Sequence, residues 1–276
     1  MKRVLITGHE GFIGKRLYER LSSSNLFSIK GLNEDYLNSY NWINELKKIL
    51  NNFRPDVIFH VGACSNTLET DSNYMMVRNY ESTKVIAEWA GINNIPLIYS
   101  SSAAIYGTNM EYPSNLYGWS KYVAEDIVTI SGGISLRYFN VYGPGEENKG
   151  IMASVAYQMF IKNKNKEEVK LFPGKPSRDF IYVDDVVDAN IFAYINYNNL
   201  EKEYYDVGSG QSRTFEDVLE IMNIPYSYHN ENDIPIGYQF NTKSNSKLWM
   251  LGWAPNFTID NGLINYKKYL ENENII

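Results

Sequence analysis

A tyrosine and a lysine stand four positions apart at Tyr117 and Lys121, downstream of a serine run that ends at Ser102. On an α-helix, this spacing places both side chains on one face. A lysine ammonium beside a phenol favours the phenolate, so the tyrosine could act as a base well below its free pKa of about 10. A nearby serine hydroxyl could hydrogen-bond the same substrate oxygen. We interpret the three residues as a catalytic set that handles the proton of a carbinol.

A glycine-rich segment, Gly8–Gly14, follows an apolar run and precedes a helical pattern. Gly8, Gly11 and Gly14 permit a tight turn and a close approach of the backbone to a pyrophosphate. The N-terminus of the following helix supplies amide donors and the positive end of a dipole. Such a turn could instead serve only to pack a helix on a sheet. Together with the catalytic set, however, it predicts hydride transfer between a nicotinamide and a carbinol.

The residue after the second predicted strand bears on the choice between NAD and NADP, because an acidic residue there binds the ribose 2′-hydroxyl and repels a 2′-phosphate. Asn33 is expected at this position and is neutral, and Lys30 is close to it in sequence. We therefore predict NADP as the cofactor. NAD remains an alternative, because Glu34 or Asp35 could still reach the ribose.

The composition places the chain among ordinary globular proteins, with 276 residues, 44% hydrophobic and 21% charged. The net charge of −6 gives no general attraction to nucleic acid or to an anionic membrane. There is one cysteine, the three histidines lack metal-ligand spacing, and no apolar run suits a signal peptide or a membrane span. We expect a cytoplasmic protein without a metal site.

Strand and helix patterns alternate in the first half of the chain, which predicts a doubly wound parallel α/β sheet of Rossmann type that binds ligands at the carboxyl ends of its strands. Strands are expected at 4–8, 26–32, 55–61, 96–100 and 134–139, and helices at 12–21, 42–50, 74–89 and 117–130. Later elements are shorter and mixed. We predict an NADP-binding domain over 1–143 with returning segments at about 180–210, and a mainly substrate-binding lobe over 144–276.

The glycine loop, the segment 102–107 and Tyr117-x-x-x-Lys121 resemble the extended short-chain dehydrogenase/reductase superfamily. Further stretches are similar to the ADP-L-glycero-D-manno-heptose 6-epimerase family within it. They lie at 62–67, 74–76, 79–80, 137–144, 149–156, 171–174, 178–183 and 237–239. The resemblance covers nearly the whole chain, and its most specific parts are 62–65 and 149–154.

The resemblance implies a reaction in which bound NADP oxidises C6 of an ADP-activated heptose, the ketone rotates, and the hydride returns to the opposite face. It implies Tyr117 and Lys149 as two acid/bases on opposite sides of the sugar, since each epimer presents its proton from a different side. Lys121 would orient the ribose, and Ser102 would hydrogen-bond the reacting oxygen. The product would serve lipopolysaccharide or another cell-surface polysaccharide.

The family also implies binding residues and an oligomer of identical chains. The cofactor would be lined by Phe12, Ile13, Val61, Gly62, Ala63, Cys64, Ser65 and Asn79, besides the glycines and Asn33. The substrate would be held by Asn140, Phe172, Pro173, Gly174, Lys175, Arg178 and Tyr238. A guanidinium such as that of Arg178 suits a diphosphate, because its fork binds two oxygens at once.

Two positions near the predicted sugar site depart from the family, with Ile151 in place of a serine and Gln158 in place of a histidine. These departures leave open another nucleotide-sugar epimerase, dehydratase or reductase. A dehydratase is disfavoured because Ala103, not an acidic residue, follows the catalytic serine. A non-catalytic dinucleotide-binding sensor is the third alternative. Without the resemblance, Glu146–Glu147 would be a solvated turn and Arg178–Asp179 a surface ion pair.

Overall fold

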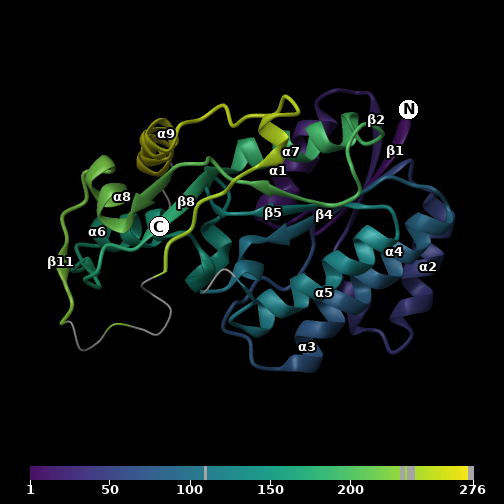
Figure 1. Cartoon of the computed structure of the whole chain (residues 1–276), viewed down its shortest axis with the longest axis horizontal. Coiled ribbons are helices and arrows are strands. Elements are labelled where there is room, and N and C mark those ends of the chain that lie inside the picture. The colour runs from purple at the N-terminus through teal and green to yellow at the C-terminus, as the bar shows by residue number, and fades with distance from the viewer. Residues whose placement is uncertain (109–110, 231–233, 235–239, 273–276) are drawn as a thin grey trace. The chain divides into compact units, whose positions relative to one another are not determined.

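The computed structural model describes residues 1–108, 111–230, 234 and 240–272 of the chain (Figure 1). The chain folds into two compact units. The first comprises Met1–Tyr138 and Val187–Tyr205, and the second Phe139–Val186 and Asp206–Ile276. The assignment of cofactor and substrate to separate parts of the chain remains a prediction. Within the described residues, no helix is both long enough and apolar enough to cross a membrane.

A six-stranded sheet forms the centre of the first unit, in the order β2-β1-β3-β4-β5-β9. Its strands are β1 (Lys2–Thr7), β2 (Phe27–Leu32), β3 (Val57–His60), β4 (Leu97–Ser102), β5 (Ile134–Tyr138) and β9 (Tyr204–Val207). The pairs among β1 to β5 are all parallel, which confirms the predicted doubly wound sheet. The strand order reverses between β1 and β3, and such a switch point is where doubly wound sheets bind ligands.

Helices cover both faces of this sheet, with α1 and α7 on one side and α2, α4 and α5 on the other (Figure 1). The helices are α1 (Phe12–Ser22), α2 (Trp42–Phe53), α4 (Ser82–Ile92), α5 (Leu116–Ile130) and α7 (Val183–Ile195). Because both faces are covered, the inner strands are buried; Val4, Leu5 and Ile6 of β1 are fully buried. Leu46 and Leu50 of α2 pack on the same core as α4 and α5.

The long helix predicted over 74–89 is interrupted. The structure has α3 (Ser72–Met76), a π-helical turn (Val77–Glu81) and then α4. No glycine or proline lies between Ser72 and Ala90, so the sequence did not indicate the interruption. The turn contains Asn79, which is fully buried, and π turns within helices are frequently found at functional sites.

Among its described residues, the second unit contains small sheets and the helices α6, α8 and α9. Its strands are β6 (Asn140–Tyr142), β7 (Lys170–Leu171), β8 (Ser177–Tyr182), β10 (Ser212–Thr214) and β11 (Ser227–Tyr228), and its helices are α6 (Val155–Lys164), α8 (Phe215–Ile221) and α9 (Ile259–Asn272). β8 pairs parallel with β6 and antiparallel with β10, and β7 pairs parallel with β11. Tyr142 centres the core, 5.6 Å from the ring of Tyr182 and 6.1 Å from that of Tyr266.

Asp179 ties three segments of the second unit together. Its carboxylate accepts hydrogen bonds from the backbone amides of Ser209, Gly210 and Ser244, and from the hydroxyls of both serines, at 2.6–3.0 Å. The interpretation of Arg178–Asp179 as a surface ion pair is wrong, because both residues are buried. The reason is that β8 is the central strand of its sheet, so the charged pair lies under the neighbouring segments rather than in solvent.

We predict that Asp179→Ala lowers the free energy of unfolding by more than about 3 kcal/mol, since it leaves several buried donors without an acceptor. The matched control is Glu167→Ala, whose carboxylate is exposed and which should change stability by about 0.5 kcal/mol or less. Urea unfolding followed by circular dichroism measures both. Equal stability of the two variants would contradict this account.

Candidate active site

The glycine loop forms a cradle at the switch point between β1 and β3. Gly8 has a φ of +65°, and a side chain there would lie 2.5 Å from Cα of Gly62. A side chain on Gly14 would strike the carbonyl of Gly8. Helix α1 begins at Phe12 with no side-chain cap hydrogen bond from Gly11, and the N-terminus of a helix favours an anion. The cradle therefore fits a pyrophosphate.

A buried histidine joins the ends of the two strands that form the cradle. The carbonyl of Asn79 accepts the hydroxyl hydrogen of Thr83 (2.6 Å), so Nε2 of His60 must donate to Thr83 Oγ1 (2.8 Å). Nδ1 of His60 then accepts from Thr7 Oγ1 (2.7 Å), which accepts from the amide of Gly62 (3.0 Å). Burial, with a smaller effect of the charge on Lys121, lowers the pKa of His60 to about 3.

His60 is therefore neutral and holds one tautomer. Sequence reasoning missed this role, because it considered the histidines only as metal ligands. A single histidine within the apolar strand 57–60 was the available signal.

Asn79 connects the cradle to the first turn of helix α5, which carries the predicted catalytic Tyr117. Its Oδ1 accepts from the amide of Cys64 (2.8 Å), and its Nδ2 donates to the carbonyl of Cys64 (3.0 Å) and to Ser120 Oγ (2.9 Å). Ser120 Oγ in turn donates to the carbonyl of Tyr117 (2.7 Å). Asn79 therefore holds the backbone of the predicted cofactor segment 61–65 through both hydrogen-bonding groups of Cys64.

Helix α5 places Tyr117 and Lys121 on one face, as predicted, next to the end of β4. Asn115 caps the helix by accepting from the amide of Gly118 (2.8 Å). A side chain on Gly118 would lie 2.6 Å from the carbonyl of Ala104, so α5 packs directly on the turn that follows Ser102. The structure thus brings Tyr117 within hydrogen-bonding reach of Ser102.

Lys121 is almost fully buried. Its Nζ donates to the carbonyl of Ser100 (2.8 Å) and lies 4.8 Å from the ring centre of Tyr99 and 6.0 Å from that of Tyr117. Burial lowers the pKa of Lys121 to about 7, and the charge of Glu125 partly opposes this effect. Glu125 itself is held by a buried bidentate ion pair with Arg137 (2.6 and 2.9 Å).

The expected lowering of the Tyr117 pKa by Lys121 is not found in this structure. Burial raises the pKa of Tyr117, and the hydrogen bond with Ser102 only partly offsets the increase. The physical reason is that the site penalises a phenolate and an ammonium alike. In this state Tyr117 is a neutral phenol, ready to donate a proton.

At the end of β2, Asn33 does not stand alone. Its Nδ2 donates to Oε2 of Glu10 from the glycine loop (2.5 Å), while Glu34 pairs with Arg78 (3.2 Å). Lys30 lies over the ring of Phe53 (6.0 Å). The charge nearest Asn33 that the structure records is therefore the carboxylate of Glu10.

The second unit holds Lys149 and Arg178. Lys149 is half-buried on a 3-10 helical segment, Glu147–Met152; burial lowers its pKa and Glu146 raises it. Arg178 is buried with its guanidinium 3.8 Å from the ring centre of Phe240 and 5.4 Å from that of Phe215. The interpretation of Glu146 as part of a solvated turn is wrong, because its side chain is fully buried.

Other predicted substrate residues lie in the same unit. Gln158 donates to the carbonyls of Ile151 (3.1 Å) and Ala153 (2.7 Å), so it braces the Lys149 segment, and Ile151 itself is 72% exposed. Phe172 stacks on His229 with ring centres 4.4 Å apart. The remaining predicted residues are Asn140, Gly174 and Lys175, which are exposed, Pro173, which is half-buried, and Tyr238, which lies outside the described residues.

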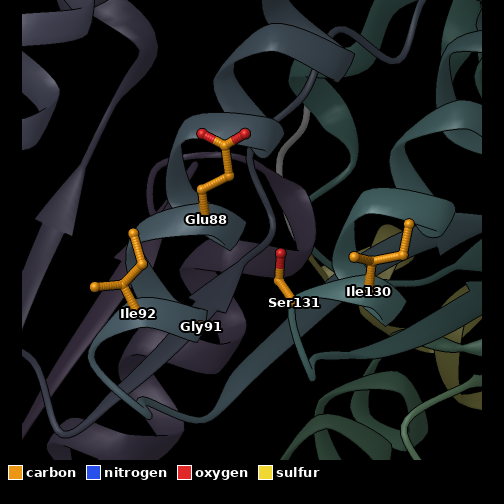
Figure 2. Close-up of a pocket in the computed structure, with 5 residues that line it drawn as sticks. All are labelled: Glu88, Gly91, Ile92, Ile130 and Ser131. Atoms are coloured by element: carbon orange, nitrogen blue, oxygen red, sulfur yellow. The ribbon is translucent and has the colours of Figure 1, made fainter.

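A surface hollow in the first unit lies away from these residues. It opens between the C-terminal ends of α4 and α5 and is lined by Glu88, Gly91, Ile92, Ile130 and Ser131 (Figure 2). None of the predicted site residues lines it, so it has no part in the chemistry considered above.

A dinucleotide cradle at the switch point, with a half-buried serine and tyrosine and a buried lysine beside it, defines a class: Rossmann-fold enzymes that act through a bound dinucleotide. Residues 4–208 match the NAD dependent epimerase/dehydratase family, and the chain belongs to that family.

Relatives with assigned names agree with this. The chain is 36% identical to ADP-L-glycero-D-manno-heptose-6-epimerase from Brachyspira hyodysenteriae, over 81% of each protein. It is 33% identical to the protein of that name from Cupriavidus pinatubonensis, over 78% of this chain and 75% of the relative. The crystal structure of the Helicobacter pylori enzyme of that name aligns with a TM-score of 0.85 at 25% identity, over 98% of this chain and 96% of the other. The chain is thus an epimerase-like isomerase.

We predict that stability depends on pH through Lys121. Its folded pKa of about 7 lies below the unfolded value, so between pH 7 and about 10.4 the unfolded chain binds a proton that the folded chain lacks. The free energy of unfolding should therefore rise with pH in that window, by roughly 3–5 kcal/mol relative to Lys121→Met. Urea unfolding without added nucleotide measures this. Lys15 is exposed on α1, so the stability of Lys15→Met should change with pH as the wild type does. If the difference in unfolding free energy between the wild type and Lys121→Met did not change with pH, the prediction would be contradicted.

Proposed function

We propose that this chain interconverts the C6 epimers of an ADP-activated manno-heptose by transient oxidation. The observation that carries the proposal is the arrangement of Tyr117, Ser102 and the buried Lys121 beside a glycine cradle. The relatives' names supply the substrate. The polysaccharide pathway, the cytoplasmic location and the homo-oligomer remain predictions from the sequence.

The cradle residues Gly8, Gly11 and Gly14, together with the segment 61–65, would hold the pyrophosphate and adenosine of the cofactor. When bound, the nicotinamide supplies the acceptor and donor of the hydride. Tyr117 exchanges the proton of the substrate hydroxyl, and Ser102 donates a hydrogen bond to the same oxygen. Lys121 keeps a positive charge within reach of the phenol for part of the time, since its pKa lies near neutrality.

Lys149 is proposed as the acid/base for the other epimer. A lysine can serve in this way near neutral pH when its pKa is lowered, and burial of Lys149 acts in that direction. Arg178 is proposed to bind the diphosphate, and Asn140, Ile151, Gln158 and the segment 172–175 to contribute to the sugar site, as the family resemblance implies.

NADP is the proposed cofactor, because Asn33 is neutral. Glu10, which accepts the hydrogen bond from Asn33, would oppose a 2′-phosphate.

We predict that Glu10→Gln strengthens NADP binding relative to NAD by about three- to tenfold, on the order of 1 kcal/mol. Isothermal titration with both nucleotides measures the ratio. Glu19→Gln, exposed later on α1, is the control, and an unchanged ratio in Glu10→Gln would remove Glu10 from the specificity site.

We predict that Tyr117→Phe lowers kcat by about 10²- to 10⁴-fold, because the general acid/base is lost while the ring still fills its place. Bound nucleotide, measured by absorbance after denaturation, should stay at the wild-type level. Tyr122→Phe, on the same helix, is the matched control and should keep its activity. Full activity of Tyr117→Phe would overturn the catalytic assignment.

The experiment that tests the function is proton NMR of ADP-D-glycero-D-manno-heptose with purified protein and no added cofactor. Appearance of the L-glycero epimer supports both the reaction and a cofactor that the enzyme carries and recycles. No conversion, with nucleotide present in the protein, would contradict the proposed substrate.

A second candidate is epimerisation or reduction of a different nucleotide sugar. The observation that favours it is Ile151, an exposed apolar side chain where the family resemblance implies a hydroxyl. Faster conversion of a nucleotide hexose than of the heptose would select this candidate.

A further inference from the structure

A buried carboxylate closes the segment that carries Lys149. Oε1 of Glu146 accepts from the amide of Gly143 (3.2 Å) and from Oγ of Ser154 (2.8 Å), and Oε2 accepts from the amide of Ser154 (2.5 Å). Gly143 directly follows β6, and Ser154 is the N-cap of α6. The carboxylate therefore links the end of a strand to the start of a helix, and the intervening chain includes Lys149.

The backbone of this segment depends on the same residue. The amide of Lys149 donates to the carbonyl of Glu146 (3.0 Å), so a single turn separates the two side chains. Gly150 has a φ of +54°, which reverses the chain immediately after the lysine. The position of the lysine is therefore set by a turn that Glu146 anchors through both its side chain and its carbonyl.

The charges around Glu146 come from several elements. Burial raises the pKa of Glu146, and its hydrogen bonds with Ser154 and the charge on Lys149 oppose this. Burial raises the pKa of Tyr157 on α6 and of Tyr266 on α9; the charge of Glu146 is the next cause for Tyr266, whereas for Tyr157 Glu147 comes before Glu146. Glu147 contributes to both tyrosines as well. Of these groups, Lys149 is the cation.

We propose that Glu146 is a positioning residue for Lys149. Its carboxylate fixes the segment between β6 and α6, and its negative charge favours the ammonium form of Lys149 against the effect of burial. This inference rests on the proposed function in one respect, the catalytic role of Lys149. The hydrogen bonds that define the role of Glu146 belong to the fold alone.

The test compares Glu146→Gln with Glu147→Gln, its neighbour of equal charge, by a measurement that does not need activity. Lysines are dimethylated with ¹³C-formaldehyde, the Lys149 signal is assigned with Lys149→Arg, and its titration is followed by NMR. In Glu146→Gln the midpoint should move down by roughly 0.5–1 pH unit, because a buried negative charge beside the amine is removed. In Glu147→Gln the shift should be less than half as large.

Two further readouts separate charge from geometry. Glu146→Asp keeps the charge but withdraws it from Gly143 and Ser154, so the Lys149 midpoint should stay near the wild type while kcat falls. In Glu146→Gln, the limb of the kcat–pH profile that follows Lys149 should move to lower pH by the amount seen in the titration.

An unchanged Lys149 titration in a folded Glu146→Gln protein would overturn the inference. If the Lys149 titration shifts but the kcat–pH profile does not, the interaction between Glu146 and Lys149 stands. Lys149 is then not the catalytic group, and the proposed function fails on that point. If Glu146→Gln does not fold, Glu146→Asp is the deciding variant. Because it keeps the negative charge, a fall of its Lys149 titration midpoint by the roughly 0.5–1 pH unit expected for loss of the charge would contradict the proposal.

Discussion

The close approach of the β1 backbone to the β3 backbone is the constraint on which the first unit depends. No side chain fits at Gly8 or Gly62, so the end of each strand fixes the course of the other. Neighbouring register pairs Thr7 with His60, and the histidine bonds across that pair. The shape of the cradle therefore follows from backbone contact and one buried imidazole.

Burial of charged groups is the second principle, and it appears independently in both units. Lys121 has a pKa near 7 because burial dominates over Glu125, and Lys149 has a lowered pKa because burial dominates over Glu146. In each case a carboxylate close to the amine keeps the shift from going further. Burial of a lysine thus lowers the pKa of its amine, and a neighbouring carboxylate limits the shift.

The sequence predicted the features that local rules govern. Alternating patterns indicated the parallel sheet, and the spacing of Tyr117 and Lys121 indicated their common helix face, because both depend on neighbours in sequence. Burial of Glu146 and Asp179 was not predictable in this way, since the amides and hydroxyls that donate hydrogen bonds to these carboxylates lie elsewhere in the chain or in its irregular turns. The raised pKa of Tyr117 was missed for the same reason: a motif gives the neighbouring charge, whereas only the fold gives the depth of burial.

Two short chains of hydrogen bonds, which meet at Asn79, link the cradle to the first turn of α5, where Tyr117 lies. The donors run from the amide of Gly62 through Thr7 to Nδ1 of His60, and from Nε2 of His60 through Thr83 to the carbonyl of Asn79.

The side chain of Asn79 then continues through Ser120 to the carbonyl of Tyr117. Each hydroxyl in this chain donates once and accepts once, so reversing any single bond would leave two donors facing each other. A second proton on His60 would do this at Thr7, and a pKa of about 3 prevents it at ordinary pH. The tautomer of the neutral histidine thus fixes the direction of the hydrogen bonds from the amide of Gly62 to the carbonyl of Asn79.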